Sequence, residues 1–310
     1  MNPPFKSVFT GGTGRSGTTI VGKLLARHEQ VHAGNPYEVK FLTGKGGLLD
    51  LVDGALNLKT QSNLMSYQIL KSAMRSKNIR QSERNLEILS SRICNDWWER
   101  KGKRGDTVGL KQGFSLPTLI EEIERLKPAY KAHPLCSSRK FFYEVVSSNL
   151  HFANSTIFVD TTPTNIERSH QIAGLLEGSQ FIHMQRGGKD TISSVLSEPW
   201  GPKEPLAAVD WWRRKLQSAN KATRRLEPEQ FLEIKLEDLV VWKRNETYAE
   251  ILKFLRINDE DKINRYFTQE INPDKAHIDR WKTDGRLDSK FHKEFDRAVS
   301  RLENEGIHAY

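Results

Sequence analysis

Short apolar runs with the character of buried strands alternate with stretches in which apolar residues recur at helical spacing. The strand-like runs occupy residues 7–12, 156–160, 180–185 and 230–236. The first helical stretch follows directly, because Ile20, Val21, Leu24 and Leu25 share one helical face. Strands that alternate with helices predict an α/β fold with three layers, in which helices cover both faces of a mostly parallel sheet.

The pattern changes between about residues 44 and 148, where helical segments dominate and strand candidates are few. No internal repeat or low-complexity segment divides the chain. We therefore expect a single domain over residues 1–310 that carries a helical insertion at about 44–148.

A glycine-rich turn connects the first predicted strand to the first predicted helix. It reads Gly11-Gly-Thr-Gly-Arg-Ser-Gly-Thr-Thr19 and, counted from Gly12, has the spacing of a P-loop. Such a turn lets backbone N–H groups and a helix N-terminus converge on phosphate oxygens. Thr18 stands where a nucleotide triphosphatase has its lysine, so Arg15 carries the positive charge. A donor without a γ-phosphate fits this loop better than ATP does.

A second turn, Arg186-Gly-Gly-Lys-Asp-Thr-Ile-Ser-Ser194, follows the third predicted strand. Arg186 stands at the strand end, and we expect Ser194 on the exposed face of the following helix, so that both reach one phosphate. Taken alone, this turn is an ordinary connection from strand to helix. Ligands of parallel sheets bind at the carboxyl ends of strands, and both turns lie there. The sequence therefore predicts one anion site.

Composition limits the kinds of partner. The net charge of +9 favours an anionic ligand, nucleic acid or an acidic surface, but lysine and arginine form no run typical of a nucleic-acid arm. Cys94 and Cys136 lack the spacing of a zinc site or a disulfide framework, which favours a reducing cytoplasm. We expect no metal and no signal peptide, and no apolar run approaches the ~20 residues of a membrane span.

With both motifs in this order, the chain resembles sulfotransferases that depend on 3′-phosphoadenosine 5′-phosphosulfate (PAPS). The 5′-phosphosulfate loop of that family resembles residues 15–19, and its 3′-phosphate motif resembles Arg186 and Ser194. Residues 231–239 and 251–255 resemble the last core strand and helix. Arg280 and Trp281 resemble the C-terminal segment that closes over the nucleotide in bacterial members. The resemblance covers roughly residues 5–40 and 155–285.

The resemblance implies PAPS as the sulfuryl donor and adenosine 3′,5′-bisphosphate as its product. The residues implied in binding PAPS are Gly14, Arg15, Ser16, Gly17, Thr18, Thr19, Arg186, Ser194, Arg280 and Trp281. Many members have a further catalytic lysine near the second strand, where this chain has Asp160-Thr-Thr-Pro163. Arg15 and Thr18 would then stabilise the leaving group, with Lys40 and Lys111 as further candidates.

A hydroxyl acceptor needs a base that takes its proton during transfer. Tyrosylprotein and carbohydrate sulfotransferases use a glutamate shortly after the first helix, and Glu38 has a similar position here. The competing interpretation is a surface glutamate paired with Lys40. No histidine, His28 and His183 included, has a spacing that favours it over Glu38.

The acceptor itself is left open. A small molecule, a sugar or a lipid would be bound by the insertion, while no nucleic acid is expected and the oligomeric state is not predicted. The aromatic runs at 97–98, 141–143 and 211–212 are more typical of core packing than of a pocket. The alternative functions are a P-loop kinase and a nucleotide-binding protein without sulfuryl transfer.

Overall fold

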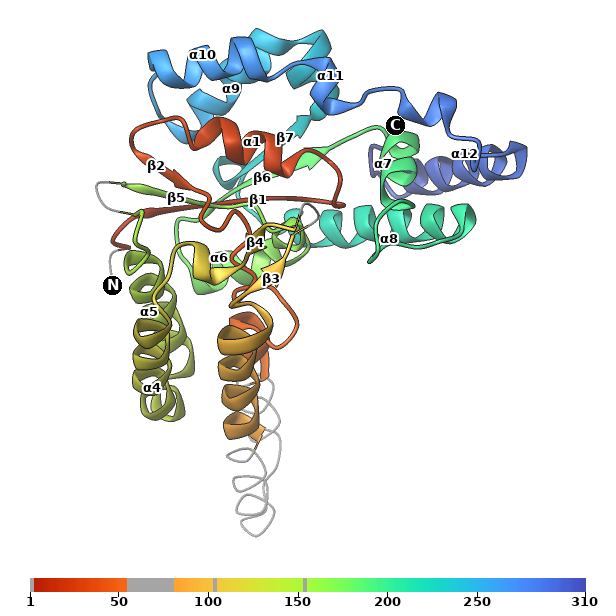
Figure 1. Cartoon of the computed structure of the whole chain (residues 1–310). Helices are drawn as coiled ribbons and strands as arrows, with labels where there is room; N and C mark the ends of the chain where they lie inside the picture. The colour runs from red at the N-terminus through yellow and green to blue at the C-terminus, as the bar shows by residue number, and fades with distance from the viewer. Residues whose placement is uncertain (1–2, 55–80, 103–104, 153–154) are drawn as a thin grey trace.

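A five-stranded parallel sheet forms the centre of the protein (Figure 1). The structure is a computed structural model that describes residues 3–54, 81–102, 105–152 and 155–310. The strands lie in the order β2-β5-β1-β6-β7. Their bounds are β1 Lys6–Gly12, β2 Val31–Ala33, β5 Ile157–Asp160, β6 Gln180–Gln185 and β7 Phe231–Lys235.

The four strands expected from the sequence are all present, and their ends agree within one residue. β2 was not predicted, because its three residues are too few to show a pattern. It forms by pairing with β5 at the edge of the sheet. All pairs within the sheet are parallel, which confirms the predicted α/β class.

Helices cover both faces of this sheet, as expected for three layers (Figure 1). One layer contains α1 (Thr18–Leu25), α9 (Arg244–Leu255) and α10 (Asp261–Glu270), which share an apolar core with Val8 of β1. Phe9, the next residue of β1, points into the core on the opposite face. That second layer includes α4 (Leu116–Ala132), α5 (Pro134–Ser147) and α6 (Ser169–Leu175).

The stretch at 44–148 extends from the second face of the sheet (Figure 1). Residues 48–54 and 81–91 are helical, and residues 55–80 of the expected insertion lie outside the described residues. Shorter elements follow: η1 (Arg92–Asp96), the hairpin β3 (Arg100–Lys101) with β4 (Thr107–Val108), and η2 (Leu110–Gln112). Residues 141–143, Trp97 and Trp212 are buried, which confirms their core assignment.

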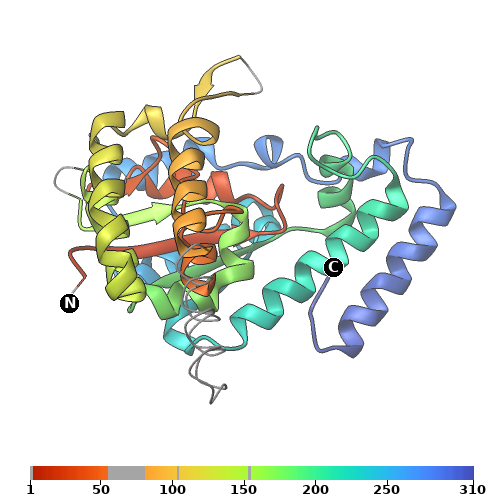
Figure 2. The ribbon, with the colours of Figure 1, turned by 90° about the horizontal axis from the view of Figure 1, so that it is seen from below.

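A third apolar cluster lies beyond the carboxyl edge of the sheet. It joins α7 (Gly188–Val195), α8 (Pro205–Thr223) and α12 (Ser289–Asn304), and α8 and α12 lie side by side in Figure 2. The remaining short elements are η3 (Pro163–Arg168), η4 (Pro228–Gln230), η5 (Asp238–Trp242), α11 (Pro273–Ala276) and η6 (Arg280–Thr283). Among the described residues, no helix combines the length and apolarity needed to cross a membrane.

Candidate functional site

The glycine-rich turn forms a tight loop between β1 and α1. Gly14, Arg15 and Gly17 have positive φ angles of 85°, 61° and 97°, so the backbone winds through the left-handed region that glycine tolerates best. A side chain at Gly12 could not fit, since its Cβ would lie 2.2 Å from Oγ of Ser16. Backbone of this kind forms nests of N–H groups that bind anions.

The hydroxyl side chains of this loop differ in exposure. Ser16 is completely buried, and its Oγ has no hydrogen-bond partner within the described residues. Thr18 is also buried, whereas Thr19 is exposed. A buried polar atom without a partner is costly in a native structure and often marks a place where a ligand or water binds.

Arg15 joins the loop to α7. Its Nε donates a hydrogen bond to Oγ of Ser194 at 2.9 Å and lies 3.3 Å from Oε1 of Glu198. The expectation that Ser194 occupies an exposed helix face was wrong, since the residue is only 1% exposed. α7 packs this face toward the loop. Glu198 was not singled out from the sequence, although it follows Ser194 by only four residues, in the turn after α7.

Arg186 lies directly after β6 and is 8% exposed. Its Nη1 donates to the carbonyl oxygen of Arg15 at 3.2 Å, and its Nη2 donates to that of His277 at 2.8 Å. Nε of Arg186 has no acceptor within the described residues. The guanidinium is therefore buried, bound to neutral carbonyl groups, and left with a free donor.

Charged groups of both signs surround Arg186. Burial is the main cause that lowers the pKa of Arg186, and the cations Arg280 and Arg15 lower it further. Asp190 and Glu237 act in the opposite direction. Burial of the guanidinium is thus the dominant unfavourable influence at this site, and the two carboxylates offset part of it.

The C-terminal segment closes this site from the side of α7. The carboxylate of Asp190 accepts the backbone N–H groups of Asp279, at 2.9 Å, and Trp281, at 3.2 Å. η6 is thereby held beside the N-terminus of α7. Nζ of Lys189 lies 4.9 Å from the centre of the Trp281 ring. A pocket of 470 Å³ opens here, lined by Ser193, His277, Arg280, Thr283, Asp284 and Arg286.

Glu38 lies in a segment fastened to the end of β5. The backbone N–H of Val39 donates to Oδ1 of Asp160 at 3.1 Å, and the backbone N–H of Thr161 donates to the carbonyl of Tyr37 at 2.8 Å. Both neighbours of Glu38 are therefore anchored. Oε2 of Glu38 lies 3.2 Å from Nζ of Lys40, so the ion pair of the competing interpretation is present.

Lys111, the other lysine candidate, lies in η2. Its Nζ donates to Oε2 of Glu99 at 2.9 Å, and both side chains are about half exposed. Asp160, which ends β5, is buried by contrast. Burial raises the pKa of the Asp160 carboxyl, while hydrogen bonds from Asn165, Val39 and Thr162 oppose the rise.

The order of the strands relates these parts to one another. β1 carries the phosphate loop and lies between β5 and β6. Residues 14–19, Arg186 and Ser194 come together through the hydrogen bonds of Arg15, and η6 joins them through Asp190. The Glu38 segment lies at the end of β5, on the other side of β1. The Glu38 segment and the turn at Arg186 therefore lie on opposite sides of the strand that carries the phosphate loop.

Comparisons with solved structures returned matches that include three sulfotransferases, each aligned over most of the chain. A sulfotransferase domain from the curacin biosynthetic pathway is 15% identical, with 99% of each chain covered and a TM-score of 0.46. A sulfotransferase domain from the Synechococcus PCC 7002 olefin synthase is 15% identical, with 97% of this chain and 95% of that chain covered and a TM-score of 0.45. Sulfotransferase STF9 from Mycobacterium avium is 11% identical, with coverages of 99% and 78% and a TM-score of 0.48.

The comparison with curated proteins returned no match. The sequence model described as the sulfotransferase family matches residues 7–261. That span includes the phosphate loop, the Glu38 segment and the turn at Arg186, and it is most of the chain. The chain therefore belongs to the sulfotransferase family.

Proposed function

We propose that the protein transfers a sulfuryl group from PAPS to a hydroxyl of a small molecule, a sugar or a lipid. The observation that carries this proposal is the joining of the phosphate loop to Arg186 and Ser194 by the hydrogen bonds of Arg15. Two anion-binding elements on neighbouring strands suit a ligand with two separate anionic groups. Adenosine 3′,5′-bisphosphate and PAPS are ligands of that kind.

The residues present fit such a nucleotide. The loop at 14–19 would hold the 5′-phosphosulfate with its backbone N–H groups and the unpartnered hydroxyl of Ser16. Arg186, with its free Nε, and Ser194 would hold the 3′-phosphate. Arg280 and Trp281 would close the site, since Asp190 holds their segment beside α7.

When bound, PAPS supplies the sulfuryl group, whose bond to the bridging phosphate oxygen breaks as the acceptor oxygen bonds to sulfur. Arg15 and Thr18 would stabilise negative charge on the departing phosphate, because a preorganised cation and donor act strongly in a partly dry site. Glu38 would take the hydroxyl proton of the acceptor. Lys40 would orient the Glu38 carboxylate through the 3.2 Å ion pair.

We further propose that the stretch at 44–148 belongs to the same domain and binds the acceptor. Nδ2 of Asn149, which follows α5, donates to the carbonyl of Asn35 at 3.0 Å. Gly113 packs tightly on that same residue, because a Cβ there would lie 1.9 Å from the Asn35 oxygen. The segment that carries Glu38 is thus in contact with the stretch proposed to bind the acceptor.

Calorimetric titration with adenosine 3′,5′-bisphosphate tests the donor. We expect micromolar binding or tighter to the wild type, and a loss of at least ~30-fold in Arg186→Ala, because a buried charged donor to phosphate is removed. Arg225→Ala, which changes an arginine beyond α8, is the control. Binding of ATP with Mg²⁺ in place of the bisphosphate would favour a kinase and contradict the proposal.

The role of Glu38 is tested separately in Glu38→Gln. We expect kcat with a hydroxyl acceptor to fall by roughly 10²–10⁴-fold, the usual contribution of a general base. Affinity for the bisphosphate should stay within ~2-fold, since Glu38 lies on the other side of β1 from Arg186. Unchanged kcat would show that Glu38 and Lys40 form only a surface ion pair.

A further inference from the structure

A largely exposed tryptophan lies against the phosphate loop. Trp200, in the connection between α7 and α8, is 59% exposed. Its Cη2 atom lies 3.4 Å from the position that a Cβ on Gly14 would occupy. The indole is therefore in contact with the loop at the residue before Arg15, while much of its surface faces solvent.

The connection that carries Trp200 is tightly folded. The backbone N–H of Glu198 donates to Val195 at 2.9 Å, and that of Gly201 donates to Glu198 at 3.1 Å. Gly201 cannot be replaced without movement, because its Cβ would lie 2.3 Å from the Val195 oxygen. Nζ of Lys203 donates to the carbonyl of Glu198 at 2.5 Å. Trp200 is thus held by a short, hydrogen-bonded turn.

Two further contacts fix the position of the indole relative to the site. The side chain of Glu198, from the same turn, pairs with Arg15 at 3.3 Å. The Trp211 ring of α8 lies 6.2 Å from the Trp200 ring at an angle of 52°, and packs against the apolar cluster beneath it. One side of the Trp200 ring therefore packs against the protein, and the other side is exposed and can contact a ligand.

We infer that Trp200 is a specificity-determining residue that stacks on the acceptor, and that the acceptor carries its hydroxyl on a ring with a flat apolar face. This inference rests on the proposed function. An aromatic ring that lies on an indole gains affinity beyond the contribution of the area it buries. The apolar face of a sugar ring offers the same kind of contact. A hydroxyl on such a ring would lie close to the phosphate loop, where the proposed function places the sulfuryl group.

Trp200 takes no part in bond making or proton transfer during the proposed sulfuryl transfer. Its effect is on where the acceptor lies. Substitution of Trp200 should therefore alter the discrimination between acceptors and leave the affinity for the nucleotide unchanged. Trp242, 64% exposed on η5, is a matched control, because it is an equally exposed tryptophan outside the residues assigned to the site.

The test compares wild type, Trp200→Ala, Trp200→Phe and Trp242→Ala with three acceptors: 2-naphthol, methyl β-D-glucoside and 1-hexanol. For each protein, kcat/KM of the better ring acceptor is divided by that of 1-hexanol. We expect this ratio to fall about tenfold in Trp200→Ala, chiefly through KM, to recover within ~3-fold in Trp200→Phe, and to stay unchanged in Trp242→Ala. The two ring acceptors show whether the ring is aromatic or a sugar.

Titration with adenosine 3′,5′-bisphosphate, run on the same proteins, separates the inference from the proposed function. Wild type that does not bind the bisphosphate overturns the proposed function and the inference with it. Wild type that binds it, but shows the same ratio in Trp200→Ala as in Trp242→Ala, overturns the inference alone. Sulfuryl transfer to 1-hexanol without transfer to either ring acceptor would also overturn the inference alone.

Discussion

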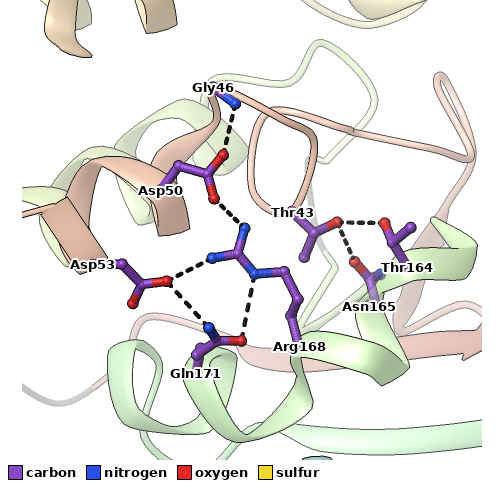
Figure 3. A network of polar contacts seen from close by, with 8 residues as sticks. All are labelled: Thr43, Gly46, Asp50, Asp53, Thr164, Asn165, Arg168 and Gln171. Atoms are coloured by element: carbon purple, nitrogen blue, oxygen red, sulfur yellow. Dashed lines mark hydrogen bonds and ion pairs between the residues drawn. The ribbon is translucent and has the colours of Figure 1, made fainter. Parts of the chain in front are cut away.

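Two arginines lie beyond the carboxyl ends of two strands of the sheet and have very different surroundings. Arg168 comes after β5, and Arg186 comes after β6. Arg168, at the end of η3, has carboxylates on both sides, with Nη1 at 2.5 Å from Oδ1 of Asp50 and Nη2 at 2.8 Å from Oδ2 of Asp53 (Figure 3). Arg186, after β6, donates to two carbonyl oxygens, and its Nε has no acceptor in the part of the chain that the structure describes. One guanidinium is paired directly with two carboxylates, whereas the other has no direct ion pair within the described residues.

This difference in surroundings indicates that Arg168 stabilises the fold, whereas Arg186 is suited to bind a ligand. Arg168 joins η3 to the helix at 48–54, and Thr43, which donates to Oδ1 of Asn165 at 3.0 Å, adds a second connection nearby (Figure 3). A cation that is already paired with carboxylates stabilises the fold, but its charge and its hydrogen-bond donors are then no longer available to bind an anionic ligand. Arg186 is held in a buried position at a desolvation cost that Asp190 and Glu237 offset only in part, and a bound anion would offset it further.

The largest expected effect is on binding at Arg186. In Arg186→Met, affinity for adenosine 3′,5′-bisphosphate should fall by at least ~100-fold, or about 2.7 kcal/mol. The free energy of unfolding should fall by no more than about 1 kcal/mol, because relief of burial and of repulsion offsets the two lost hydrogen bonds. Calorimetry and urea unfolding measure the two quantities. A large loss of stability with unchanged affinity for the bisphosphate would show that Arg186 stabilises the fold and does not bind the nucleotide.

Arg168→Met should show the opposite behaviour. We expect the free energy of unfolding to fall by ~2 kcal/mol, less than for a deeply buried pair, because Asp50 and Asp53 remain 41% and 36% exposed. Bisphosphate affinity should stay within ~2-fold. The variant carrying Arg168→Met with Asp50→Asn and Asp53→Asn is the control, and it should recover part of the loss in urea unfolding.

Asp190→Ala tests the attachment of the C-terminal segment to the site. Asp190 accepts the N–H groups of Asp279 and Trp281, so its loss should free η6 and weaken bisphosphate binding about tenfold. Amide hydrogen exchange should become faster at 279 and 281 and stay unchanged in α4. Normal affinity despite faster exchange would show that η6 does not contact the nucleotide.

The smallest effect concerns a neutralised pair beside the site. The hydrogen bond from Arg286 is the main cause that holds the pKa of Asp284 well below its ordinary value of 3.8, and Ser193 contributes too. The unfolded chain therefore binds this proton first as the pH falls. The stability due to Asp284 is present above about pH 4 and is lost progressively in more acidic solution.

Asp284→Asn should remove this contribution and flatten the dependence of unfolding free energy on pH between about 4 and 2. The difference should be less than about 1 kcal/mol, because the Arg286 side chain is 42% exposed. Urea unfolding at several pH values measures it, with Asp296→Asn on the exposed face of α12 as the control. An equal slope in wild type and Asp284→Asn would contradict the low pKa.

The sequence alone determined the α/β class, the four longer strands and the place of the phosphate loop. These features depend on local rules: apolar runs form buried strands, and glycines permit the turn at residues 14–17. The turn at Arg186 was also found this way, since a strand end followed by a helix is visible in the chain. Local patterns sufficed to predict these strands and turns because each of them is formed by a segment of about ten residues.

Only the tertiary structure decided which side chains meet. It placed Ser194 on a buried face, brought Glu198 to Arg15, and added β2 to the sheet through its pairing with β5. It also left Arg186 with a free donor while it gave Arg168 two carboxylates. Such contacts join residues more than a hundred positions apart, and the free energy of a charged group depends on its burial and neighbours in space, neither of which a linear pattern contains.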